Sequence, residues 1–276
     1  MVPQIIIKKH LLRLLLLLPL LSCFSIGANA QFRELGFGIG GMTLSGDINP
    51  NFSFRETLPA AMVTYRKNYP FGFSLRYELL VGGIQGADSR TQRDDFAVQR
   101  NASFSAVNAE LGALLEYNFM DFRSGKSGFP WTPYLFMGAA LNYYQGTAEI
   151  APPAPFPSTK YNFNTLGFRA TESDGTVYDQ SYTPFPLVIP LGFGFKYALN
   201  TYWTMNLEFG ARLTFTDRMD MLSEDIQQVN KPVPSPQLNP QRDYYYPHDT
   251  KADVYYYFGI SFSYGFFSVP CPHDFY

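Results

Sequence analysis

Apolar and polar side chains alternate along most of this chain. In eight segments a bulky apolar residue occupies every second position, and segments with a helical period are nearly absent. Strict alternation is typical of β-strands with one face against an apolar environment. The pattern therefore predicts an all-β chain with strands at about residues 34–46, 60–67, 71–85, 103–119, 132–147, 185–197, 202–216 and 252–267.

The connections between these segments alternate between short and long. The sequence has short turns at 68–70 and 198–201 and a moderate connection at 120–131, whereas the other four connections, 47–59, 86–102, 148–184 and 217–251, are long. This alternation is typical of an up-and-down barrel in an outer membrane, with its short turns and both termini in the periplasm. We therefore predict an eight-stranded antiparallel transmembrane β-barrel over residues 31–268, with its long loops facing outward.

Soluble barrels share this strand count, so the content of each face decides the orientation. One face of the predicted strands is uncharged and mostly bulky. It holds every second residue from Phe73 to Val81 and from Trp203 to Phe215. Turned inward, it would overfill a small barrel, so we expect it to face lipid. The other face carries many glycines and serines together with eight charges, which are predicted to pair inside the barrel: Arg66, Arg76, Glu78, Glu110, Glu116, Lys196, Glu208 and Arg212. A proton or ion pathway, or a catalytic carboxylate pair, is the alternative reading of these charges.

Residues 1–30 have the parts of a secretory signal: a basic start, a leucine run and small residues before a cleavage site. We expect cleavage after Ala30, with lipidation at Cys23 as the alternative. Cleavage would leave Cys271 as the one cysteine, in a periplasmic tail at residues 269–276. A disulfide from Cys271 to a partner protein is one prediction for this thiol, and an unpaired thiol is the other.

Composition narrows the class of function. The formal net charge of −2 argues against a nucleic-acid partner, and no cysteine and histidine cluster has metal-ligand spacing. The letters GFGIGG at residues 36–41 match a dinucleotide fingerprint, but they lie within a predicted strand, so no cofactor is expected. His248 in the last long connection, with Asp249 or Asp243 as its partner, is the candidate base for an outer-membrane hydrolase or acyltransferase. We favour a protein that is not an enzyme.

Three phrases point to a family: ELGFGIGGMTLSGDI at 34–48, YWTMNLEFGARLTFTDRMDMLS at 202–223, and FGISFSYGFF followed by a CP tail at the end. They resemble the PorG-type outer-membrane barrels of the type IX secretion system. The resemblance implies a non-enzymatic component in the outer membrane of a Gram-negative bacterium. It also implies a periplasmic partner, a ring made of a lipoprotein and a second periplasmic protein.

If the barrel binds such a ring, the contact is expected at the short-turn end and the tail, through Asn68, Tyr69, Arg123, Lys126, Asn200, Thr201, Cys271 and Pro272. The alternative is an adhesive or structural surface barrel of the OmpA or OmpX type that acts through its outer loops. Tyr244 to Tyr246 and the proline-rich runs at 151–157 and 231–240 would then carry the function.

Overall fold

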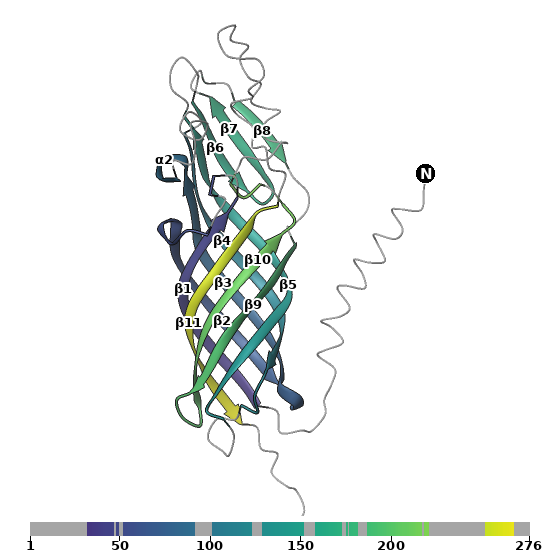
Figure 1. Ribbon diagram of the computed structural model, residues 1–276. Helices are drawn as coiled ribbons and strands as arrows, with labels where there is room; N and C mark the ends of the chain where they lie inside the picture. The colour runs from purple at the N-terminus through teal and green to yellow at the C-terminus, as the bar shows by residue number, and fades with distance from the viewer. Residues whose placement is uncertain are drawn as a thin grey trace, which may run out of the picture. The chain divides into compact units, whose positions relative to one another are not determined.

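The structure, a computed structural model, describes residues 32–46, 48–49, 52–91, 101–122, 129–151, 158–172, 175, 177–181, 187–216, 218–220 and 252–267. It confirms the predicted fold class, because eight antiparallel strands close into a barrel (Figure 1). Among the described residues, no helix is long and apolar enough to cross a membrane. The barrel strands are β1 (Phe32–Ser45), β2 (Thr57–Asn68), β3 (Phe73–Ala87), β4 (Ala102–Asn118), β5 (Trp131–Ile150), β9 (Leu187–Ala198), β10 (Trp203–Thr214) and β11 (Val254–Phe267).

The pairing of β4 with β5 closes the sheet into a barrel. Neighbouring strands in the sequence pair with each other, β5 pairs with both β4 and β9, and the first strand, β1, lies beside the last, β11. Short helical turns also occur outside the strands: η1 (Phe54–Glu56), η2 (Pro70–Gly72) and α2 (Asp88–Thr91). The dinucleotide-like run at residues 36–41 lies wholly within β1, so it has no strand-to-helix turn.

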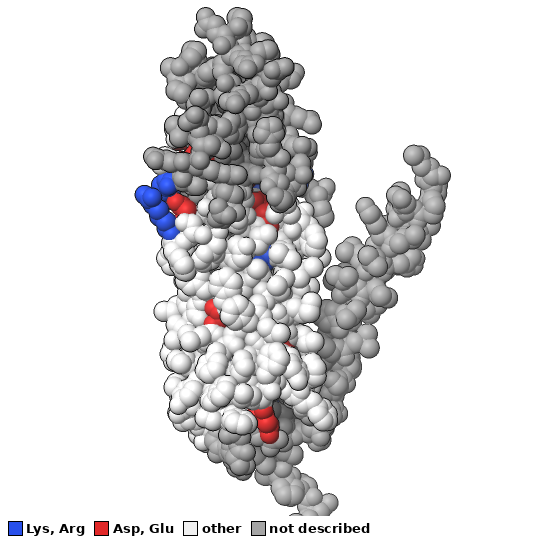
Figure 2. Space-filling view, viewed as in Figure 1, with Lys and Arg blue, Asp and Glu red and all other residues white. Residues whose placement is uncertain are grey.

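The predicted division of the two faces is correct. Side chains such as Leu111, 62% exposed, and Phe193, 57% exposed, point away from the barrel axis. Arg76, Glu78 and Glu110 on the opposite face are fully buried. The space-filling view shows few charged side chains on the barrel wall (Figure 2). This arrangement, with the apolar face outside and the polar face inside, is the reverse of that in a soluble barrel and matches a barrel surrounded by lipid.

Aromatic side chains form a belt near the short-turn end of the barrel. The ring of Tyr117 lies 5.0 Å from Phe73, Trp131 stacks on Phe195 at 5.6 Å, and Trp203 meets Tyr264 at 5.3 Å. Belts of this kind are typical of the boundary between lipid and water in membrane barrels.

The prediction that residues 148–184 form only a long loop is wrong. β5 continues to Ile150, and three further strands follow it: β6 (Thr159–Asn164), β7 (Gly167–Glu172) and β8 (Val177–Ser181). They extend the sheet beyond the barrel (Figure 1). On its exposed surface, Arg169 hydrogen-bonds to Asp179 and thereby lowers the pKa of that carboxyl group. These strands are five or six residues long, which is too short for the alternation to be distinctive.

The barrel interior has two layers. Buried apolar side chains fill the part nearer the long connections, among them Met42, Leu80 and Ile84, and this cluster continues into β6 and β7. Ile48 and Met219, which come from two of the long connections, belong to the same cluster. A network of paired charged side chains fills the part nearer the short turns, whereas Asp88, Asp220 and Asp253 are buried at the end with the long connections. An eight-stranded barrel has room for side chains and little else, so the two layers close its interior.

Candidate functional site in the barrel interior

The network of ion pairs begins at the short-turn end with Arg66 on β2. Its guanidinium lies 2.6 Å from Glu34 on β1 and 2.7 Å from Glu116 on β4. The Glu34 carboxylate also accepts hydrogen bonds from Asn68, at 2.7 Å, and from Ser263 on β11, at 2.9 Å. Strand alternation points all of these side chains inward, so Arg66 joins strands that are not neighbours in the sheet.

Arg76 on β3 occupies the middle of the network. It lies 2.9 Å from Glu78 and 3.0 Å from Glu116, and it makes two hydrogen bonds to Glu208 on β10. Its guanidinium also lies over the ring of Phe136, 4.6 Å from the centroid. Because both charges and hydrogen-bonding groups meet here, the cost of burying Arg76 is offset by several partners.

Two more cations complete the set. The Lys196 ammonium lies 2.7 Å from Glu116 and 4.6 Å from the ring of Tyr134. Arg212 on β10 lies 3.6 Å from Glu78 and 3.7 Å from Glu110, which are looser contacts than those of Arg66. Hydroxyl groups supply the remaining donors: Tyr134 donates to Glu208 at 2.9 Å, and Tyr255 donates to Glu110.

The structure places all eight predicted inward charges inside the barrel and adds Glu34, which the sequence analysis left out. The described interior network therefore holds five carboxylates and four cations, so it is not the balanced set of four and four expected from the sequence. Glu34 has the same parity as Gly36 and Gly38, the inward residues of β1, and that parity was the signal that could have revealed it.

Glycines make room for the large side chains of the network. The Phe136 ring lies where a side chain at Gly192 or Gly210 would be, since a Cβ at either position would meet its Cζ at 2.6 or 2.7 Å. Tyr134 covers Gly194 in the same way, at 2.4 Å. Small residues on the inward face are therefore required by the rings that cross the barrel from β5.

The predicted contact residues that are described form ordered turns. Asn68 connects the network to Ser74, whose hydroxyl donates to the Asn68 side chain at 2.6 Å. Asn200 caps its own turn by accepting from the backbone of Tyr202 and Trp203, and Thr201 is exposed. Tyr69 is exposed beside Lys67, whose ammonium lies 5.2 Å from its ring.

The other predicted contact residues, Arg123, Lys126, Cys271 and Pro272, lie outside the described residues, as does His248. Within the described part of the chain, no group of histidine, cysteine and acidic residues could hold a metal ion. The network residues are almost fully buried, with Glu208 the most accessible at 6%. The paired charges join strands that are not neighbours, and the layer of apolar side chains separates them from the end with the long connections.

Comparisons with solved structures return barrels of low similarity. Ail of Yersinia pestis, in complex with the heparin analogue sucrose octasulfate, is 7% identical, with a TM-score of 0.42, and covers 86% of this chain and 100% of its own. Neisserial surface protein A is 10% identical, with a TM-score of 0.40, covering 87% and 99%. A major outer membrane protein from Thermus thermophilus is 12% identical, with a TM-score of 0.45, covering 86% and 100%.

A search of curated proteins finds no match. The sequence profile of one family does match, over residues 9–150, which include β1 to β5 and most of the charged residues of the network. The chain belongs to the family described as "Domain of unknown function (DUF6089)".

Proposed function

We propose that the protein is an outer-membrane barrel of a Gram-negative bacterium that serves as a docking scaffold and is neither a channel nor an enzyme. Its long connections face outward and both termini face the periplasm. The apolar outer wall and the aromatic belt near the short turns support this membrane placement.

The observation that carries the proposal is the filled interior. Nine ionisable side chains pair with one another across the barrel, and an apolar layer lies above them. A solute path would require these buried pairs to separate, which costs several kcal/mol when one partner is lost. Function therefore falls to the two ends of the barrel and to its lipid-facing wall.

For the partner, we propose a periplasmic lipoprotein and ring complex of a type IX-like secretion system, bound at the short-turn end. The resemblance of three phrases to PorG-type barrels supports this choice. The turns at Asn68 and Asn200 are fixed by hydrogen bonds to the network or within the turn, so they offer a rigid surface. A rigid surface loses little conformational entropy when a partner binds.

The test is to purify the tagged full chain from outer membranes without reductant and to identify the proteins that accompany it. We expect a periplasmic ring component, together with a higher-mass band that disappears with reductant and with Cys271→Ser. Recovery of the barrel alone, with surface proteins still secreted in a deletion strain, would contradict the secretion role.

A second candidate function, surface binding or adhesion, is favoured by the β6 to β8 extension. This sheet continues past the barrel on the side of the long connections, and it exposes Leu166 and Val177. Replacing residues 151–186 with a short glycine and serine linker separates the two candidates. The replacement abolishes binding to cells or matrix under the second function, and it leaves recovery of a periplasmic partner intact under the first.

A further inference from the structure

The lipid-facing wall contains a groove that neither the network nor the two ends explain. It crosses the outside of β11, β1, β2 and β3, and its volume is about 810 Å³. Its lining is entirely uncharged and consists of Ile39, Gly40, Gly41, Pro59, Ala60, Ala61, Val81, Gly82, Phe258, Gly259 and Ile260.

The groove follows from small residues on the outward face of two strands. Gly41 pairs with Pro59, and Ala61 pairs with Ile39. Ala61 leaves space beside Ile39, whereas Thr57 and Phe258 cover the outward side of Gly41. Val81 on β3, 39% exposed, stands on one side of this depression and Phe258 on β11 on the other. A hydrocarbon chain is the apolar ligand that suits such a depression in a lipid-facing wall.

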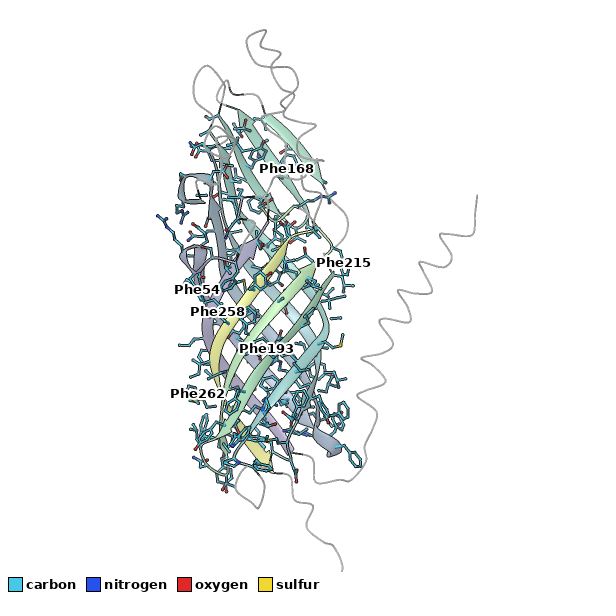
Figure 3. The ribbon with its side chains drawn as sticks, viewed as in Figure 1. Phe54, Phe168, Phe193, Phe215, Phe258 and Phe262 are labelled. Carbon is cyan, nitrogen blue, oxygen red and sulfur yellow. The ribbon has the colours of Figure 1, made fainter. Side chains whose placement is uncertain are left out.

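Residues 52–56, which precede β2, pack against the outside of the barrel beside the groove. The Thr43 hydroxyl donates to the Ser53 carbonyl at 3.3 Å, and the ring of Phe54 packs edge-on against Phe258 at 5.5 Å. Figure 3 shows Phe54 and Phe258 close together on one side of the barrel. Phe54 is 72% exposed, which suits a position beside lipid.

Two exposed arginines lie on the same side of the groove. Arg55 follows Phe54, and its guanidinium donates to the carbonyl of Arg90 on α2 at 3.4 Å. Arg90 forms an ion pair with the buried Glu56 at 3.2 Å. A basic patch is visible at the level of α2 in Figure 2. These three side chains carry one positive charge in excess, next to the open end of an uncharged groove.

We propose that the groove binds one anionic lipid of the outer leaflet, with an acyl chain between Val81 and Phe258 and a phosphate at Arg55 and Arg90. The inference rests on the proposed outer-membrane location. Pro59 follows Arg55 by four residues, so the two backbone positions are at most about 13 Å apart, less than the length of an extended acyl chain. Guanidinium groups bind phosphate through paired hydrogen bonds, which explains why arginine stands at the headgroup position.

The test uses the purified full chain in detergent, titrated with phosphatidylglycerol or with phosphatidylcholine of the same acyl chains, and native mass spectrometry to count bound lipid. We expect one phosphatidylglycerol to bind at about tenfold lower concentration than phosphatidylcholine. Arg55→Gln removes this preference. The matched control, Arg33→Gln, changes an exposed arginine at the opposite end of β1 and keeps it.

A second pair of variants tests the groove itself. Ala61→Leu places a larger outward side chain in the groove and weakens binding of both lipids, whereas Ala139→Leu, on the exposed wall of β5, leaves binding unchanged. Equal binding of the two lipids by the unaltered chain would overturn the proposal. So would a dimer that Ala61→Leu dissociates without any change in lipid binding, since the groove would then hold a second copy.

The proposed outer-membrane location is tested separately, by fractionating cells and finding which fraction contains the protein. A barrel found outside the outer membrane would refute the proposed function whatever lipid it binds in detergent. A chain that is found in the outer membrane and shows no lipid preference would refute this inference alone.

Discussion

Arg66 Nε lies 2.7 Å from Glu116 Oε2, and this ion pair joins β2 to β4 across the strand between them. Glu116 also contacts Arg76 and Lys196, so one carboxylate serves three cations in the closed interior. The contact holds the barrel wall together from the inside, where no backbone pairing exists between these strands.

Removing the Glu116 carboxylate should destabilise the barrel strongly. Glu116→Ala leaves three cations with one carboxylate fewer, and we expect a loss of about 3 to 5 kcal/mol in the free energy of unfolding, measured by urea titration in detergent. Asp179→Asn, which breaks the exposed Arg169 pair on the extension, is the control and should leave the unfolding midpoint unchanged. Equal midpoints for the two variants would contradict the structural role of the network.

The glycines beneath the crossing rings should tolerate no side chain. A Cβ at Gly194 would meet Tyr134 at 2.4 Å and the Leu207 carbonyl at 2.6 Å, and Tyr134 cannot move freely because it donates to Glu208. Gly194→Ala should cost about 1 to 3 kcal/mol in stability. Gly112→Ala, whose nearest neighbours are 3.1 Å away or more, should cost less, and unfolding curves of the two variants compare them directly.

Phe71, in the turn between β2 and β3, has a strained backbone conformation and an exposed side chain. Its φ is 65°, in the left-handed region that a bulky residue rarely adopts, and its side chain is 91% exposed. Phe71→Asn should keep or raise the unfolding midpoint, because asparagine tolerates this conformation better. If the short-turn end binds a periplasmic partner, the same variant should recover less of it. If the variant recovers as much of the partner as the unaltered chain does, Phe71 does not take part in the contact.

The two faces of the barrel were predictable from the sequence because a period of two assigns every residue of a strand once a few are placed. Glu34 was missed because it is the first residue of the strand predicted at 34–46, where the alternation begins. The partners within the network could not be foreseen, since Arg76 and Glu208 are 132 residues apart and alternation fixes direction without fixing register. The position of Arg55 beside the groove depends on how residues 52–56 pack on the outside of the barrel, and no periodicity encodes that contact.

The filled interior predicts the absence of ion conduction. Incorporated into a planar bilayer, the full chain should show no stable open state, because the charged layer and the apolar layer both close the barrel. Arg76→Ala combined with Arg212→Ala opens space in the charged layer alone, so it too should remain silent. Steady conduction by the unaltered chain would contradict the packing described for the interior.

The central claim, a barrel whose apolar wall meets lipid, is tested most directly by placing a charge on that wall. Leu111→Arg, at an outward position within β4, should lower the stability of the chain folded in a bilayer by about 2 to 4 kcal/mol. Leu166→Arg, at a comparably exposed leucine in the turn between β6 and β7, should leave it unchanged. Similar and small effects of the two substitutions would mean that water, and not lipid, surrounds the wall, and the account would fail.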